Sequence, residues 1–228
     1  MSLSHSPKII TNGLVLCLDA ADKKSYPGTG TLWTDRSGNG NNGNISGPTY
    51  SNNAFTYNSS SITSIPATNL KPTTGITQES WVLFTNNTAQ AMIGLQYGSG
   101  EDNSYAIWLN SPNTWAAGVR VNGAFNFSTY TSTVSINIYY HFVHTFDGSV
   151  QRLYLNSSLV NSKASAGSIQ YDTNNTLLAI GNDYNNGYNG GAGFGVQGKL
   201  AKASIYNRAL TPQEILQNFN ATRGRYGI

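Results

Sequence analysis

Short segments in which apolar and polar residues alternate recur along the chain, and Gly, Asn, Ser or Pro bounds most of them. The clearest are residues 14–19, 79–84, 91–97, 104–109, 115–121, 139–146, 150–155, 177–180 and 199–206. An alternation of period two places successive side chains on opposite faces of a strand. About ten such strands, with no helical pattern between them, predict an all-β sandwich of two antiparallel sheets.

Two local signals refine this prediction. Asp147-Gly148 separates two of the segments, and this dipeptide favours a β-hairpin with a type I′ turn, which needs positive φ at its central residues. Near the C-terminal end, Thr211 precedes Pro212, and Glu214 follows the threonine by three residues. This pattern is typical of a helix capping box with proline in the first turn. We therefore predict one short helix over residues 211–223, with Gly224 as its stop.

The 228 residues fit a single β-sandwich, and no linker composition divides them. We predict an N-terminal arm, residues 1–12, followed by one domain, residues 13–228. The net charge of +3 is too small to predict a nucleic-acid partner. No apolar run approaches the length of a membrane span, and the first residues lack the pattern of a signal peptide. We expect synthesis in the cytoplasm and no membrane partner.

Residues 33–44, WTDRSGNGNNGN, are rich in glycine and asparagine. No helix pattern follows and no Gly-Lys-Ser/Thr is present, which excludes a phosphate-binding loop. Asp35 is the only acid, which excludes an EF-hand loop. Two interpretations remain: a connection between two strands, or a loop that helps to hold calcium through Asp35. The first is favoured, because Asn and Gly supply the backbone conformations that turns need.

Three stretches resemble the laminin-G-like branch of the concanavalin A-like lectin/glucanase superfamily. They are Gly13–Ala20 with Tyr26–Gly30 and Trp33–Gly43, then Tyr140–Gly148 leading to Leu153–Asn156, then Gly198–Leu200 through Ile205–Thr211. The resemblance covers about residues 12–222 and implies a concanavalin A-like jelly roll. Within this family, Ser4–Lys8 and Gln217–Gly227 are similar to virion proteins of tailed bacteriophages, notably those of marine cyanobacteria. This implies a place in the virion, other virion proteins as partners and an oligomeric state on the particle.

The glucanases of this superfamily raise the question of catalysis. Their carboxylates follow a Glu-x-Asp-x-(x)-Glu pattern on one strand, and none of Glu79, Glu101 and Glu214 begins such a pattern. His141 and His144 are three residues apart on a predicted strand, so they point to opposite faces and cannot share a metal ion. We expect one to be half-buried and the other to lie at the surface. The sequence therefore predicts a protein that is not an enzyme.

Calcium ions bind at the rim of the sandwich in many relatives, and Asp19, Asp35 and Asp183 are the candidate ligands here. The acidic pairs that such relatives carry are replaced by Asn58–Ser61 and by Ala201-Lys202. Because the affinity for calcium depends on the charge of its ligands, we expect neither calcium nor any other cofactor.

A glycan-binding surface is predicted in the loop Asn182–Gly195, where aromatic rings stand beside amides. Rings contact the C–H faces of sugars, and amides bind their hydroxyls. The candidate ligand-binding residues are Tyr184, Asn185 and Tyr188, extended by Trp108 and Trp115. Two alternatives are that the glycine-rich loop is a mobile connector and that both tryptophans belong to the core.

The last thirty residues are basic, with Glu214 as their only acid. The candidates for docking onto an acidic particle surface are Lys199, Lys202, Arg208, Arg223 and Arg225. The alternative is a solvated helix end, where arginine interacts favourably with the helix dipole.

Our leading hypothesis is a non-enzymatic virion surface protein, either a head decoration or a tail or fibre adhesin, that binds glycans of the host surface. A glycan hydrolase or depolymerase of the same fold and a purely structural cement protein are the alternatives.

Overall fold

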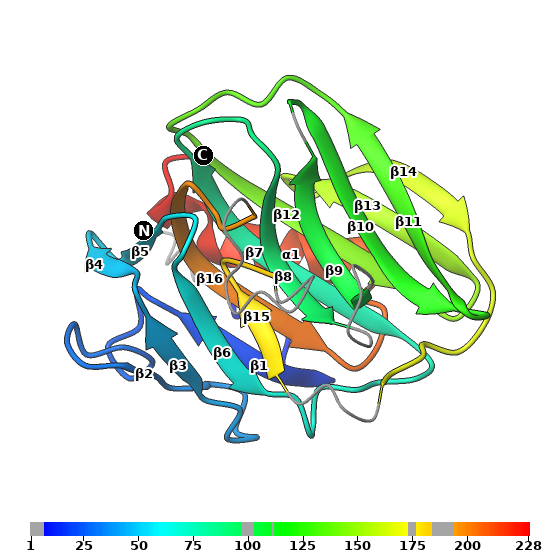
Figure 1. The fold of residues 1–228 in the computed structure, drawn as a ribbon, viewed down its shortest axis with the longest axis horizontal. Helices are drawn as coiled ribbons and strands as arrows, with labels where there is room; N and C mark the ends of the chain where they lie inside the picture. Colours follow the sequence, from blue (N-terminus) through cyan, green and yellow to red (C-terminus); the bar gives the residue numbers. More distant parts are fainter. Residues whose placement is uncertain (1–6, 97–102, 111, 173–176, 184–193) are drawn as a thin grey trace, which may run out of the picture.

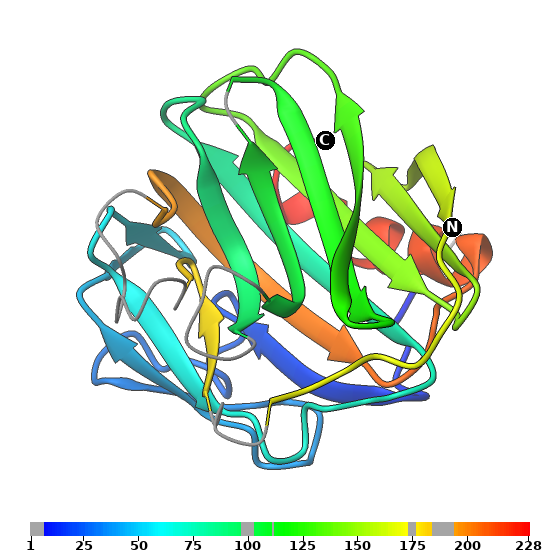
Figure 2. The same ribbon diagram turned by 45° about the vertical axis from the view of Figure 1, so that its right-hand side comes forward.

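Two antiparallel β-sheets packed face to face make up most of the chain, as the alternation predicted (Figure 1 and Figure 2). This computed structural model describes residues 7–96, 103–110, 112–172, 177–183 and 194–228. Every pairing between the named strands is antiparallel.

We call the two layers sheet A and sheet B. Sheet A runs in the order β14 (Ser158–Ala164), β13 (Val150–Leu155), β12 (Tyr139–Phe146), β7 (Ile76–Phe84), β16 (Gly198–Tyr206), β5 (Ala54–Tyr57) and β4 (Thr49–Ser51), with β1 (Leu14–Asp19) also paired to β16. Sheet B runs in the order β11 (Ala124–Thr131), β10 (Thr114–Val121), β9 (Asn103–Asn110), β8 (Gln90–Gln96), β15 (Leu177–Ile180), β6 (Ile62–Pro66), β3 (Gly43–Ser46) and β2 (Leu32–Trp33).

Sixteen strands lie in the described part of the chain, more than the alternation predicted. Strands β2 to β6 have five residues or fewer, too few for a recurring pattern. Strands β11 and β14 were missed because they are edge strands rich in Asn, Ser and Thr with few buried positions.

The hairpin between β12 and β13 is confirmed, but its turn is not of type I′. Residues 147–149 connect the strands, and only Gly148 has a positive φ, +89°. Asp147 accepts hydrogen bonds through Oδ1 from the backbone N–H groups of Ser149 and Val150, at 3.0 and 2.8 Å. These hydrogen bonds from the backbone to the Asp147 side chain stabilise the turn without the second residue of positive φ that a type I′ turn needs.

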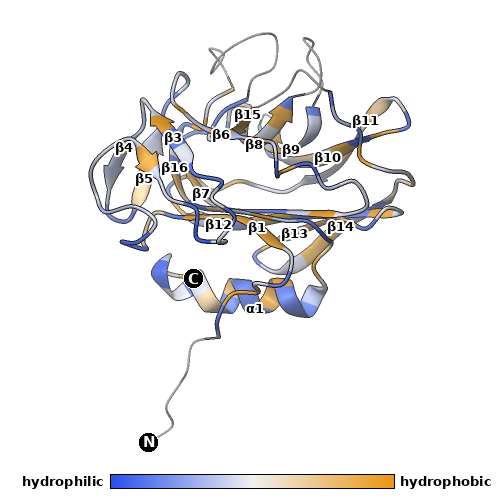
Figure 3. Ribbon diagram, turned by 90° about the horizontal axis from the view of Figure 1, so that it is seen from below, coloured by the Kyte–Doolittle hydropathy of each residue, from blue (hydrophilic) through white to orange (hydrophobic). Residues whose placement is uncertain are grey.

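The predicted helix is α1 (Pro212–Thr222), which lies over the outer face of sheet A (Figure 3). Its capping box is present: Thr211 Oγ1 accepts from the Glu214 N–H at 3.3 Å, and Glu214 Oε2 accepts from the Thr211 N–H at 2.8 Å. Gly224 is not the stop, since the chain continues into a 3₁₀ turn, η2 (Arg223–Arg225). No helix among the described residues is long and apolar enough to cross a membrane.

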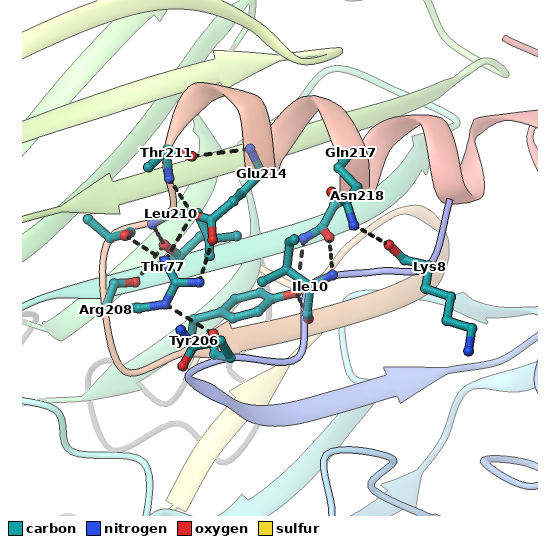
Figure 4. Close-up of polar contacts among 12 residues, drawn as sticks. Lys8, Ile10, Thr77, Tyr206, Arg208, Leu210, Thr211, Glu214, Gln217 and Asn218 are labelled. Carbon is teal, nitrogen blue, oxygen red and sulfur yellow. Dashed lines mark hydrogen bonds and ion pairs between the residues drawn. The ribbon is translucent and has the colours of Figure 1, made fainter. Parts of the chain in front are cut away.

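The segment predicted to be an arm outside the domain packs against α1 from Lys8 onward (Figure 4). Gln217 donates to the Lys8 carbonyl at 2.7 Å, and the Ile10 N–H donates to Asn218 Oδ1 at 2.8 Å. The Tyr206 hydroxyl donates to the Ile10 carbonyl at 3.0 Å. Since Ile9 and Ile10 also contact the apolar cluster beneath α1, this segment is part of the domain.

We expect Thr211→Ala to lower the free energy of unfolding by about 1 kcal/mol, because the first turn of α1 loses its cap. Urea denaturation followed by circular dichroism measures the change. Gln213→Ala, at an exposed position in the same turn, is the control and should change stability by less than about 0.5 kcal/mol. Equal effects of the two substitutions would show that the cap contributes nothing specific.

Candidate functional site

The two broad outer faces of the sandwich differ. In the described residues, α1 covers the outer face of sheet A, whereas no helix lies over the outer face of sheet B (Figure 3). Tyr105, Ile107 and Leu109 of β9 point into the core, so Trp108 points outward. The outer face of sheet B is therefore the candidate surface for contacts with other molecules.

Pairing between strands arranges this face in rows. Trp108 lies opposite Ala116, which lies opposite Thr129. In the next row, Gly118 of β10 lies between Ala106 and Phe127. The rows on either side are Asn110, Thr114 and Thr131, and Arg120 with Phe125.

Three aromatic rings cluster over the middle of these rows. The Trp108 ring centroid lies 5.8 Å from that of Phe125 and 5.9 Å from that of Phe127, and the two phenylalanine rings are 6.3 Å apart. Because β10 lies between β9 and β11, the rings meet above its small, buried residues Ala116 and Gly118. We call Trp108, Phe125, Phe127, Ala116 and Gly118 the platform.

A glycine is required under the platform. A Cβ at Gly118 would stand 2.5 Å from the Asn126 carbonyl oxygen and 2.9 Å from Phe127 Cβ. Its absence lets the Asn126 and Phe127 backbone of β11 approach β10 closely. Phe127 remains 47% exposed, while Trp108 and Phe125 are half-buried. Such an exposed aromatic cluster is a candidate for ligand binding.

Hydroxyl and amide groups border the platform. Thr114 and Thr131 form a hydroxyl pair at 3.2 Å, and Asn110 and Thr129 are exposed. Further along the same face, Asn103 donates to Asp183 Oδ2 at 3.1 Å. Asn103 Oδ1 and Ser104 Oγ are buried without a hydrogen-bond partner. The face thus combines apolar rings with groups that bind hydroxyls.

The predicted ligand-binding residues do not all lie at one site. Trp108 belongs to the platform, but the prediction for Trp115 is wrong, because Trp115 is fully buried between the sheets. Its ring packs against those of Tyr140 and Phe142, at 5.0 and 4.9 Å. Tyr184, Asn185 and Tyr188 lie outside the described residues.

Phe125 and Phe127 were not predicted from the sequence. The signal was present, because Asn122-Gly123 is a type I′ turn dipeptide and both residues have positive φ, +52° and +79°. The two phenylalanines that follow alternate with Asn126, which places them on one face.

The run 33–44 is the connection between β2 and β3, and Asp35 holds it together. Asp35 Oδ1 accepts from the N–H groups of Cys17 and Ser37, at 2.9 and 2.8 Å. Asp35 Oδ2 accepts from the Ser37 hydroxyl at 2.6 Å and the Asn41 N–H at 3.0 Å. Asp35 therefore performs a structural role within the loop.

The other candidate metal ligands are also engaged by protein groups. Asp19 forms an ion pair with Arg225 at 2.7 Å, and Asp183 accepts from Asn103. Among the residues that the structure describes, no three His, Cys, Asp or Glu side chains lie close enough to share a metal ion.

The basic residues near the C-terminal end do not form one docking patch. The prediction for Lys202 is wrong: it is buried and forms an ion pair with Glu79 at 3.0 Å. Arg208 pairs with Glu214 at 2.7 Å, and Arg225 pairs with Asp19. Lys199 is half-buried and Arg223 is exposed. The acids that pair with Lys202 and Arg225 come from the distant strands β7 and β1, which an inspection of the last thirty residues could not reveal.

Both histidines of β12 are buried. Their opposite orientation is confirmed, since His141 lies 3.3 Å from Glu79 beneath α1, whereas His144 contacts Gln78 and Gln151 on the other side of the sheet. The prediction of a surface histidine is wrong, because neither side chain is exposed. Burial lowers the pKa of His144 to about 4, although a hydrogen bond to Gln151 opposes the shift.

Among the described residues, surface hollows lie around the C-terminal turn. One of about 450 Å³ is lined by Lys8, Cys17, Asp19 and Arg225, among others, and one of about 250 Å³ by Asn52, Tyr139 and Tyr226. Four charged groups of the larger of these two hollows are paired, Asp22 with Arg36 and Asp19 with Arg225.

A jelly-roll sandwich with an exposed aromatic platform and a polar border has the architecture of a lectin-like domain. Comparison with protein families agrees: the Laminin_G_3 model, described as the concanavalin A-like lectin/glucanases superfamily, matches residues 55–216. The chain belongs to this superfamily. A search of curated protein sequences gave no significant match.

Solved structures share the fold at low sequence identity. Trypanosoma rangeli sialidase in complex with sialic acid matches 99% of this chain at 14% identity and a TM-score of 0.67. The binding domain of Paraclostridial Mosquitocidal Protein 1 matches 92% at 17% identity and a TM-score of 0.67. A structure of botulinum neurotoxin type C, described as interacting with two ganglioside molecules, matches 93% at 12% identity and a TM-score of 0.65. The matched regions are 37%, 52% and 52% of those chains.

Proposed function

We propose that this chain is a carbohydrate-binding domain without enzymatic activity and that the platform is its binding surface. The observation that carries the proposal is the exposed aromatic cluster of Trp108, Phe125 and Phe127 on the face that α1 leaves open. Membership of a lectin/glucanase superfamily supports it. So do the sialic acid and gangliosides named with two of the structural neighbours.

In this proposal, the C–H face of a sugar ring lies on the exposed face of Phe127 and contacts Trp108. Aromatic rings offer a large apolar area with little conformational freedom to lose. Hydroxyl groups of the sugar then reach the border formed by Asn110, Thr114 and Thr131. Hydroxyls and amides both donate and accept hydrogen bonds, which suits the alternating donors and acceptors of a saccharide.

A hydrolase of the same fold is the second candidate function. Glycoside hydrolysis generally requires two carboxyl groups that flank the scissile bond. The two glutamates within the described residues are committed to structure, Glu79 beneath α1 with Lys202 and Glu214 in the helix cap. Binding without hydrolysis is therefore the function that we favour.

We also propose that the domain is displayed on a virion, as a head decoration or a tail or fibre adhesin, together with other virion proteins. This proposal extends the resemblance to virion proteins of tailed bacteriophages that we inferred from Ser4–Lys8 and Gln217–Gly227 in the sequence. Electron microscopy of purified particles, with the chain located in the map, tests it. Firm attachment to particles together with no glycan binding would favour the cement protein instead.

Phe127→Ala and Trp108→Ala are each expected to weaken glycan binding by about thirtyfold, because each removes an aromatic anchor. A glycan array selects the ligand, and isothermal titration measures the dissociation constants. Leu216→Ala, which shortens an exposed apolar side chain on α1, is the matched control and should leave binding unchanged.

Tyr184→Ala and Tyr188→Ala test the surface first predicted from the sequence. If these two substitutions abolish binding and the platform substitutions do not, the binding surface is the loop. If no glycan binds, the proposed function is wrong.

A further inference from the structure

We infer that the platform selects saccharides that carry a negative charge, such as a carboxylate or sulfate group. The inference rests on the proposed function and names the class of ligand. Lys163 is the residue that carries it: its ammonium group lies 5.8 Å from the centroid of the Phe127 ring and donates a hydrogen bond to the Phe127 carbonyl oxygen at 2.8 Å.

Lys163 reaches the platform from the other sheet. It belongs to β14, the edge strand of sheet A, and Phe127 belongs to β11, the edge strand of sheet B. Two neutral side chains of sheet A also form hydrogen bonds to β11 of sheet B. Asn161 donates to the Thr129 carbonyl at 2.6 Å, and Gln151 donates to the Asn126 carbonyl at 3.1 Å. These contacts hold the two edges together and keep the Lys163 ammonium beside Phe127.

A positive charge is not needed to connect the edges of the two sheets, because Asn161 and Gln151 make such connections with neutral amide groups. Lys163 is exposed, and an ammonium group has three N–H donors. The structure records one hydrogen bond from Lys163 and no ion pair within the described residues. In this inference, the remaining donors bind a sugar that is stacked on Phe127.

The charged side chain in the described residues of the four rows is a cation, Arg120. Arg120 occupies the row next to Phe127, opposite Phe125, and its Nη2 donates to the Gly123 carbonyl at 2.6 Å. The described residues of the four rows include no Asp or Glu. Asp183, a carboxylate on the same face, lies beyond β9 beside Gly94 of β8, whereas Lys163 approaches from the β11 edge.

A charged saccharide would therefore make a charge-assisted hydrogen bond to Lys163 while its ring contacts Phe127. Such bonds are stronger than those between neutral groups. A neutral saccharide of the same shape would stack equally well but would lack this bond. The platform rings then determine whether a sugar binds, and Lys163 determines which sugars bind most tightly.

Titration with lactose and with 3′-sialyllactose, or with the neutral and acidic pair that an array selects, tests the inference. We expect the acidic member to bind about tenfold more tightly to the unmodified domain. Lys163→Gln should remove this preference by lowering the affinity for the acidic member far more than the affinity for the neutral member, whereas Lys163→Arg should retain it. Raising the salt concentration should reduce the preference in the unmodified domain. Lys199→Gln, at a half-buried lysine on β16, should have no effect.

Equal affinity for the two members, or a preference that persists in Lys163→Gln, would overturn the inference while leaving the proposed function intact. An equal loss of both affinities in Lys163→Gln would show that the lysine acts only by holding β11 in place, and would overturn it as well. Absence of binding to every glycan would overturn the proposed function itself.

Discussion

Replacing Glu79 with glutamine should lower the free energy of unfolding by about 3–5 kcal/mol, because it leaves the Lys202 ammonium buried without its counter-charge. The two side chains are each about 1% exposed, and Lys202 Nζ lies 3.0 Å from Glu79 Oε1. Chemical denaturation of the purified domain measures this change.

The carboxylate also joins α1 to sheet A, which adds to the expected loss. Asn218 of α1 donates to Glu79 Oε2 at 2.8 Å and to the Tyr206 hydroxyl at 2.9 Å. His141 Nε2 lies 3.3 Å from Glu79 Oε1, and its ring packs beside those of Trp81 and Phe219. One substitution therefore weakens a charge pair and the docking of a helix.

Two further variants show whether the buried charge is the cause. Glu79→Gln combined with Lys202→Met should recover part of the lost stability, because no buried charge then lacks a partner. Asp22→Asn, which breaks the exposed pair with Arg36, should cost less than about 1 kcal/mol. A Glu79→Gln protein as stable as the Asp22→Asn protein would contradict the argument.

The same pair predicts how stability depends on pH. Burial raises the pKa of Glu79, but the Lys202 ammonium and His141 lower it by more, so the folded protein holds this pKa well below its ordinary value of 4.5. A carboxyl group of this kind stabilises the fold fully above pH 4.5, and the contribution is lost as the pH falls toward the folded pKa. Glu79→Gln should therefore make the acid side of the stability profile flatter.

Trp115→Ala should also cost about 3–5 kcal/mol, because it opens a cavity where the ring now packs between the two sheets. Trp115 is completely buried and contacts the rings of Phe84, Tyr140 and Phe142. Urea denaturation measures the loss. Trp108→Ala is the matched comparison, and it should cost less stability because its ring is only half-buried.

A conservative variant separates the volume of Trp115 from its polar group. The indole Nε1–H of Trp115 is buried and has no hydrogen-bond partner among the residues that the structure describes. Trp115→Phe should therefore cost less than Trp115→Ala, because it keeps most of the packing and removes an unsatisfied donor. If Trp115→Ala and Trp108→Ala changed stability equally, the distinction between core and platform would be wrong.

The sequence predicted the architecture well where its signals are local. Long strands such as β7, β12 and β16 keep an alternation that can be recognised, and Thr211, Pro212 and Glu214 mark the start of α1. The alternation could not predict on which side of the sheet each tryptophan lies. Trp108 stands between Ile107 and Leu109, all apolar, so the alternation does not say which side is buried. Only the packing of sheet B against sheet A decides it.

Local sequence therefore determined that the chain forms alternating strands and one capped helix, because backbone conformation and helix capping depend on residues a few positions apart. Tertiary structure decided which face stays open and which charges are buried. Glu79 and Lys202 are 123 positions apart, and the platform with its lysine joins residues from β9, β10, β11 and β14. Burial and charge pairing depend on neighbours in space, which arise only when the two sheets pack together.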